Sequence, residues 1–306
     1  MTSTLEGASP LPHLGVIRVE GEDAARFLQG QLTQDFVLLG AGEARLAAFC
    51  NAKGRMQASF VGVPLGSGAF ALVVSRDLLE RTLRRLSMFV LRSKARLADA
   101  TAEFEMRGLA GAAVRQAAGG TTPAPWEHVS HDGIHVVGLY PADGQPRALW
   151  LAPAGTAAPD APALDAALWR WGEVRSGVAT LTEPVFEAFV PQMLNYESVG
   201  GVNFRKGCYP GQEVVARSQF RGTLKRRAYP ARCDEALAAG MALFHESDPE
   251  QPCGLVAQAA QAPDGPWDAI VSVQLTATQG GRIAVGAAGG PQLHLQPLPY
   301  PLLEDI

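Results

Sequence analysis

Short apolar segments that return on themselves through tight turns constrain the fold of this chain most strongly. Residues 43–51 (EARLAAFCN) and 56–63 (MQASFVGV) flank a turn, and this spacing is typical of a β-hairpin. Apolar residues at helical spacing follow other strand-like segments, over 22–32 and 77–91. Isolated helices among hairpins, without regular strand–helix–strand units, predict an α+β fold.

Two further helices and one helix cap follow from the positions of glycine and aspartate. Residues 110–120 (AGAAVRQAAGG) and 165–177 (DAALWRWGEVRSG) have helical patterns that end at glycine, the second at Gly177. Asp77 stands at the start of the 77–91 helix, where its carboxylate can cap the first free N–H groups.

The pattern changes at about Thr223, after which glycine and proline separate short strand-like segments. These segments are LKRRAYPARC (224–233), GMALFHE (240–246), GLVAQAAQ (254–261), WDAIVSVQL (267–275), RIAVGAA (282–288) and LHLQPL (293–298). Many short strands with turns at regular spacing predict a small β-barrel or sandwich. A chain of 306 residues is also long enough for about two domains.

Composition narrows the classes of protein. The net charge of the whole chain is −4 and does not attract nucleic acid, so we expect no DNA partner. No apolar run approaches the ~20 residues of a membrane helix, and the N-terminus lacks the pattern of a targeting segment. We therefore expect a cytoplasmic protein without a membrane partner. The four cysteines form no CxxC pair, so we expect no metal site.

One stretch, residues 203–232, departs from the acidic average. It holds eight Lys and Arg residues against one acid, Glu213, so its local net charge is +7. Such a run is often a solvated face, or a patch that lies beneath an acidic neighbouring domain. It is equally consistent with a seat for a polyanionic ligand or for an RNA backbone.

The segment KGCYPGQE (206–213) lies inside this stretch. Pro210-Gly211 predicts a type II turn in which Gly211 has positive φ, and this turn would hold Cys208 at a fixed point. Arg205 and Lys206 flank the thiol and would lower its pKa. Two interpretations remain, a reactive thiol beside a cation and a buried cysteine in a tight loop.

Other candidate ligands lie within and outside the motif. Glu213 and Arg217 have the spacing of a helical ion pair, although Glu213 could instead accept hydrogen bonds from a heterocycle. Lys53 and Arg55 surround the turn of the first hairpin, either as an ordinary hairpin tip or as a wall of the same pocket.

The two tryptophans of the 165–177 helix are further candidates. Trp169 and Trp171 are two residues apart, so they face different sides of the helix. Core packing is the default for both, but one of them could stack on a ligand ring.

The segment FVPQMLNYESVGGVNFRKGCYPGQEVVAR, from Phe189 to Arg217, closely resembles the YgfZ-type folate-binding proteins. This family belongs to the superfamily of the glycine-cleavage T-protein, an aminomethyltransferase, and its hallmark is K-G-C-aromatic-x-G-Q-E. Other segments resemble the family as well, namely FLQGQLTQD (27–35), CNAKGRM (50–56), FRGTLKR (220–226) and LHLQPLPY (293–300).

The resemblance implies a three-part, ring-like architecture. Residues 1–222 would form the folate-binding region, in which a discontinuous domain of about 1–50 and 120–222 receives a ferredoxin-like insertion of about 51–119. Residues 223–306 would form an antiparallel β-barrel. Tetrahydrofolate, or a one-carbon folate, would lie at the centre of the ring.

The resemblance also implies a function and a set of site residues. The function is support of iron–sulfur cluster synthesis or repair in client enzymes, including radical enzymes that modify tRNA. Cys208 would be the functional thiol, assisted by Lys206. The expected folate contacts are Trp169, Lys53, Arg55, Tyr209, Gln212, Glu213 and Arg217.

Two positions depart from the family pattern. Leu14 stands where the family often has a folate-contacting Trp, and Arg175 stands in place of an acid at the end of the 165–177 helix. Two alternatives therefore stay open beside the first function: a folate-dependent one-carbon transferase, and an RNA-binding module with weak RNA contact through the basic stretch. Whether the protein is an enzyme is not decided by the sequence.

Overall fold

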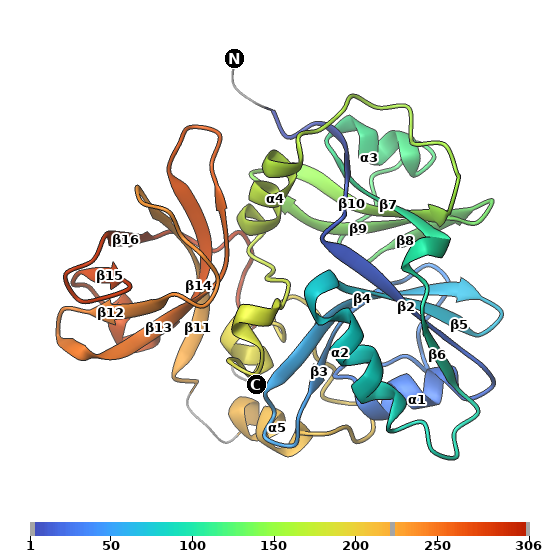
Figure 1. Cartoon of the computed structure of the whole chain (residues 1–306), viewed down its shortest axis with the longest axis horizontal. Coiled ribbons are helices and arrows are strands. Elements are labelled where there is room, and N and C mark those ends of the chain that lie inside the picture. The colour runs from blue at the N-terminus through green and yellow to red at the C-terminus, as the bar shows by residue number, and fades with distance from the viewer. Residues whose placement is uncertain (1–3, 221–223, 304–306) are drawn as a thin grey trace.

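A computed structural model describes residues 4–220 and 224–303. The chain forms two five-stranded antiparallel sheets and a closed six-stranded barrel (Figure 1). The barrel lies at one side of the molecule, and the two sheets lie at the other, with helix α4 (Ala166–Arg175) between them. The predicted α+β class with a C-terminal antiparallel barrel is confirmed.

The first sheet contains the predicted hairpin. Its strands, in spatial order, are β3 (Arg45–Cys50), β4 (Met56–Gly66), β5 (Ala69–Ser75), β2 (Leu14–Glu20) and β6 (Arg96–Asp99). Ile17 and Leu72 point to the face that α1 (Ala24–Gln31) and α2 (Arg76–Ser87) cover. Val16 and Val73, one residue away, point to the opposite face and pack toward the second sheet.

The second sheet packs face to face with the first. Its strands, in order, are β1 (Gly7–Pro10), β7 (Phe104–Ala110), β10 (Gln145–Pro153), β9 (Ile134–Ala142) and β8 (His128–His131). Leu149 and Leu151 join Val16 and Val73 in one core between the sheets. The short helix α3 (Ala112–Ala117) covers the outer face of the second sheet.

The segment between the second sheet and the barrel carries most of the predicted site. It contains α4, the short 3-10 turns η2 (Glu183–Val185) and η3 (Pro191–Leu194), and helix α5 (Gln212–Phe220). The Asp165 carboxylate caps α4 by accepting from the N–H groups of Ala167 and Leu168, and Gly177, with φ of 71°, follows its end. The predicted helix is confirmed, although it runs from Ala166 to Arg175 and not over the whole of 165–177.

The barrel closes completely. Its strands, in order, are β11 (Arg226–Cys233), β14 (Trp267–Gln274), β13 (Asp248–Gln261), β12 (Ala242–His245), β15 (Ile283–Val285) and β16 (Gln292–Leu295), which pairs back with β11. Two short 3-10 turns, η1 (Thr101–Glu103) and η4 (Leu275–Thr278), complete the described elements. Closure removes exposed sheet edges, so the strands can be short.

Two details differ from the sequence predictions. Helix α2 begins at Arg76 and not at Asp77, whose carboxylate lies in the first turn and accepts from the Ser75 hydroxyl and the Glu183 N–H. In addition, β3 pairs with β4 across the predicted domain limit near residue 51. The strands of residues 14–99 therefore share one sheet, because the hairpin hydrogen bonds join the two sides of that limit.

Candidate functional site

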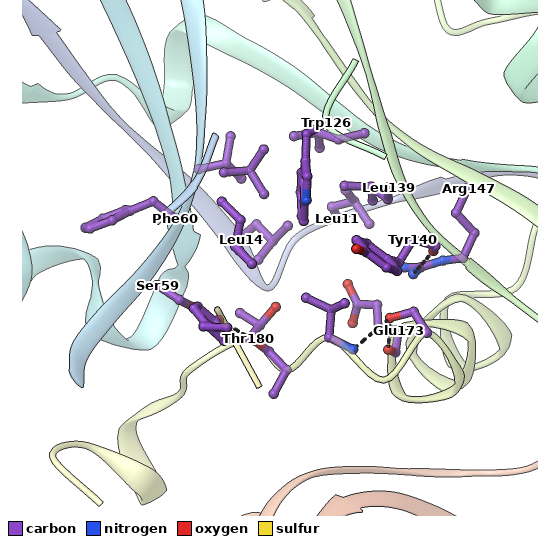
Figure 2. A pocket seen from close by; sticks show the side chains of 18 of the residues that line it. Leu11, Leu14, Ser59, Phe60, Trp126, Leu139, Tyr140, Arg147, Glu173 and Thr180 are labelled. Atoms are coloured by element: carbon purple, nitrogen blue, oxygen red, sulfur yellow. Dashed lines mark hydrogen bonds between the residues drawn. The ribbon is translucent and has the colours of Figure 1, made fainter. Parts of the chain in front are cut away.

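A central pocket of about 80 Å³ lies where the two sheets meet α4 and the segment that follows it. Most of its lining is apolar or aromatic, and Figure 2 shows the side chains converging on it from both sheets. The lining includes Leu11, Leu14, Leu46, Ser59, Phe60, Val73, Trp126, Leu139, Tyr140, Arg147, Trp169, Glu173, Thr180 and Tyr196. A concave apolar site with few polar groups is the usual form of a small-molecule pocket.

Helix α4 contributes a buried carboxylate to this pocket. Glu173 Oε1 accepts a hydrogen bond from Trp169 Nε1 at 3.0 Å and lies 3.1 Å from His13 Nε2. Burial raises the pKa of Glu173, but the contacts with His13, Arg147 and Trp169 together hold it below its usual value. Glu173 is therefore a carboxylate at neutral pH.

A buried arginine faces this carboxylate from β10. Arg147 is 3% exposed, and its guanidinium lies 4.3 Å from the centroid of the Trp169 ring. Burial lowers the pKa of Arg147 to about 10, which Glu173 partly opposes, so the group is still charged at pH 7. Its Nε has no hydrogen-bond partner among the described residues. The pocket thus offers an unused N–H donor beside a carboxylate acceptor.

The two tryptophans of α4 face different sides, as predicted. Trp169 lies at the central pocket, whereas Trp171 Nε1 donates to Asp268 Oδ2 of the barrel at 2.7 Å. Leu14 lines the pocket as well. Arg175 lies on the barrel side, where its guanidinium binds the Asp143 carboxylate at 2.6 Å and Gln296 Oε1 at 2.5 Å.

The KGCYPGQE motif forms a second site. The Gln212 N–H donates to the Tyr209 carbonyl at 3.2 Å, and Gly211 has φ of 80°, so the predicted type II turn is confirmed. A Cβ atom on Gly211 would lie 2.4 Å from the Asn51 carbonyl oxygen and 2.7 Å from Gly54 Cα. The motif and the 51–55 hairpin turn therefore pack backbone against backbone.

Lys206 anchors the motif to the end of helix α1. Its ammonium donates to the carbonyls of Gln29 and Leu32, the latter at 2.6 Å, and lies 4.5 Å from the centroid of the Tyr209 ring. These carbonyls belong to the negative end of the helix dipole. Burial lowers the pKa of Lys206 to about 8, although nearby Asp35 and Cys208 favour the charged form. Cys208 itself is exposed.

The remaining predicted ligands gather around the motif. Arg55 Nη1 donates to the Ala188 carbonyl at 2.6 Å, and Lys53 is exposed at the hairpin turn. Glu213 and Arg217 form the predicted helical ion pair at 2.6 Å, and Gln212 begins α5. Of the pocket-lining residues that the structure describes, Trp169 alone belongs to the predicted folate contacts.

The basic stretch does not act as one surface. Arg227 pairs with buried Glu197, Arg232 binds Asp268 at 2.7 Å, and Lys206 and Arg217 have the partners given above. Arg221 lies outside the described residues, as do the other residues of 221–223 in the FRGTLKR segment. Arg226 donates to the Pro252 carbonyl at 3.3 Å, so five of the seven cations of the stretch that the structure describes have separate partners within the fold.

The sequence analysis missed the polar pair of the pocket. Glu173 follows Trp169 by four residues on a buried helix face, and an acid at such a position is a detectable signal. Arg147 lies in β10 among apolar residues, which is the corresponding signal in a strand. Between residues 4–220 and 224–303, no group of three or more His, Cys, Asp or Glu side chains is placed to hold a metal ion. No helix in these ranges is long and apolar enough to cross a membrane.

The fold is that of the glycine-cleavage T-protein class. The model of the GCVT N-terminal domain matches residues 7–134. The structure is similar to the crystal structure of the glycine cleavage system aminomethyltransferase T from Bartonella henselae, with a TM-score of 0.69 at 19% sequence identity. The match covers 99% of this chain and 88% of that one.

Sequence comparison identifies a narrower family. The chain is 32% identical to the tRNA-modifying protein YgfZ of Edwardsiella ictaluri, over 93% of this chain and 89% of that protein. It is 31% identical to the protein of the same name from Pectobacterium carotovorum, over 93% and 88%. The chain belongs to the YgfZ family.

Proposed function

We propose that this protein binds tetrahydrofolate, or a one-carbon folate, in the central pocket. Through this binding it supports iron–sulfur enzymes that modify tRNA. The observation that carries the proposal is the buried set of Arg147, Trp169 and Glu173. The relatives that are named tRNA-modifying proteins give the process in which the proposed function acts.

The chemistry of the pocket fits a pterin ring. The ring carries a cyclic amide, whose carbonyl accepts and whose N–H donates. Arg147 Nε is an unused donor, and Glu173 Oε2 accepts no hydrogen bond from a described residue. A buried donor beside a buried acceptor selects a ligand that has an acceptor and a donor on one edge. A ligand without both groups would leave Arg147 or Glu173 unpaired.

The aromatic lining supports the same ligand. The rings of Trp126 and Tyr140 lie 6.0 Å apart at the pocket. Trp126 provides an aromatic face close to the side where Leu14 replaces the family's tryptophan, since both line the same cavity. Stacking on such a face contributes on the order of 1 kcal/mol.

Cys208 has a separate place in this proposal. It is the exposed cysteine, whereas Cys50, Cys233 and Cys253 are buried, and Lys206 holds its loop against α1. An exposed thiol on an anchored loop suits contact with a client protein. Iron–sulfur enzymes are the proposed clients, and Cys208 is the proposed functional thiol.

A folate-dependent one-carbon transferase is the second candidate. The observation that favours it is Glu173, a buried carboxylate that its partners keep ionised and that can therefore act as a base. Turnover of a folate adduct by the purified protein would distinguish this function from a binding function. An RNA-binding module is less well supported, because most cations of the basic stretch are paired within the fold.

The test is an anaerobic calorimetric titration with tetrahydrofolate. We expect saturable one-to-one binding that Glu173→Gln weakens by about tenfold or more, because a charged acceptor is lost. Trp171→Phe is the matched control, since Trp171 lies on the same helix but bonds the barrel. Equal dissociation constants for wild type and Glu173→Gln would contradict the proposed pocket.

A cellular test addresses Cys208. Cys208→Ser should fold normally, because its side chain is exposed, and should reduce thiomethylated tRNA nucleosides measured by mass spectrometry. An unchanged nucleoside profile at normal expression would show that the thiol is not required.

A further inference from the structure

A second cavity, of about 530 Å³, adjoins the central pocket. We call it the vestibule. Its lining comes from the start of α2, from α4, from the 180–184 segment and from the barrel strand β13, and it includes Arg76, Asp77, Arg170, Glu173, Thr180 and Gln258. Glu173 and Thr180 line both cavities, so the two are neighbours. These two side chains form the boundary between the two cavities.

The vestibule is polar where the central pocket is apolar. Arg76 and Arg170 line it and are exposed. Neither guanidinium has a hydrogen bond or an ion pair within 4 Å to a residue in the described ranges 4–220 and 224–303, although Arg76 interacts electrostatically with the Asp99 carboxylate at longer range. Two arginines in one cavity without a protein partner are a ready site for anions.

The acidic side chains of the vestibule already accept hydrogen bonds from other groups of the protein. Asp77 accepts from the Ser75 hydroxyl at 2.6 Å and from the Glu183 N–H at 3.0 Å. Glu173 is held by Trp169 and His13 at the boundary with the central pocket. The N–H donors of the two guanidinium groups are therefore left for a ligand.

We propose that the vestibule binds the carboxylates of a γ-linked polyglutamate tail, carried by the folate whose ring lies in the central pocket. This inference rests on the proposed function. Each glutamate of the tail adds one carboxylate, and a planar guanidinium binds a carboxylate with two parallel hydrogen bonds. The change from apolar pocket to arginine-lined vestibule follows the change from ring to tail along such a ligand.

The same assignment explains why the basic stretch is not needed for the tail. Arg217, Arg227 and Arg232 bind acids of the protein, and Lys206 binds the backbone carbonyls at the end of α1. Arg76 and Arg170 are distant from that stretch in sequence and have no such partners. The protein thus prefers folates with long tails over the monoglutamate.

The experiment compares two ligands by anaerobic calorimetry, tetrahydrofolate monoglutamate and tetrahydrofolate triglutamate. For the wild type at low salt we expect the triglutamate to bind about fivefold to tenfold more tightly than the monoglutamate, because it forms two additional, partly exposed charge pairs. Added salt should reduce this ratio, because exposed ion pairs are screened.

The decisive variant is Arg76→Gln with Arg170→Gln. It should bring the ratio of the two affinities to below about twofold. The matched control is Arg26→Gln with Arg115→Gln, which removes the same charge from exposed positions on α1 and α3. The control should keep the wild-type ratio.

The outcomes separate the two proposals. Equal affinities of the wild type for both ligands would overturn the tail site and leave the pocket in place. A ratio that survives in the Arg76 and Arg170 variant, or falls equally in the control, would also overturn it. Failure of both ligands to bind the wild type would overturn the folate pocket and, with it, the tail site.

Discussion

The contact between the KGCYPGQE motif and the hairpin turn leads to a sharp prediction about two glycines. Gly211 and Gly207 lie four residues apart in the same motif. A Cβ atom on Gly211 would lie 2.4 Å from the Asn51 carbonyl oxygen and 2.7 Å from Gly54 Cα and N, whereas a Cβ on Gly207 meets nothing within 4 Å. Gly211→Ala and Gly207→Ala are therefore the same chemical change in opposite surroundings.

The magnitude follows from two physical effects. An alanine at the φ of 80° that Gly211 adopts costs about 1–2 kcal/mol, because Cβ approaches the following carbonyl. The contacts with Asn51 and Gly54 are to backbone atoms, which cannot rotate away, and such overpacking costs about 1–3 kcal/mol. We expect Gly211→Ala to lower the free energy of unfolding by about 2–5 kcal/mol, or to displace the motif from the turn.

Two assays distinguish these results. Urea unfolding reports the loss of global stability, and Gly207→Ala should stay within about 0.5 kcal/mol of the wild type. Alkylation of Cys208, the exposed cysteine, reports the loop and should be severalfold faster in Gly211→Ala. Equal stability and equal alkylation rates for the two variants would show that the motif does not pack on the hairpin turn.

Two further predictions concern the buried groups His135 and Lys206. Burial lowers the pKa of His135 to about 4, so the neutral histidine contributes up to about 3 kcal/mol of stability above pH ~6.5, and this contribution is lost as the pH falls toward 4. His135→Phe should therefore flatten the decline in the free energy of unfolding, measured with urea between pH 7.5 and 4.5, and a decline parallel to that of the wild type would refute this reasoning. Lys206→Met leaves two helix carbonyls without a donor and should cost about 1–3 kcal/mol, whereas exposed Lys225→Met should cost almost nothing. Equal thermal stability of the two lysine variants would contradict the anchoring role.

Local patterns were sufficient to predict the elements of the fold. The hairpin over β3 and β4, the helices α2 and α4, and the barrel strands all follow from periodicity and from glycine and proline positions. The start of α2 was misplaced by one residue because Ser75 and Asp77 are both good capping residues, and the structure uses Ser75 as the N-cap residue.

The candidate site was harder to predict, because it depends on which elements meet. The turn at Gly211 is local and was predicted correctly. The electrostatic interaction of Arg147 with Glu173 links β10 to α4 at the central pocket, and no local pattern encodes it. Conversely, residues that are close in sequence can have unrelated partners in the fold. Arg227 and Arg232 of the basic stretch pair with different acids.

The anchoring of Lys206 also has a consequence for biosynthesis. The lysine reaches carbonyls that lie 177 and 174 residues earlier in the chain, and Gly211 rests on a turn that is also formed early. Cys208 therefore acquires its setting only after the ribosome has made the first 211 residues and helix α1 and the hairpin have folded. A chain that is truncated or partly folded carries Cys208 on an unanchored loop, so the cysteine reaches its anchored position only after the first 211 of the 306 residues have been made and folded.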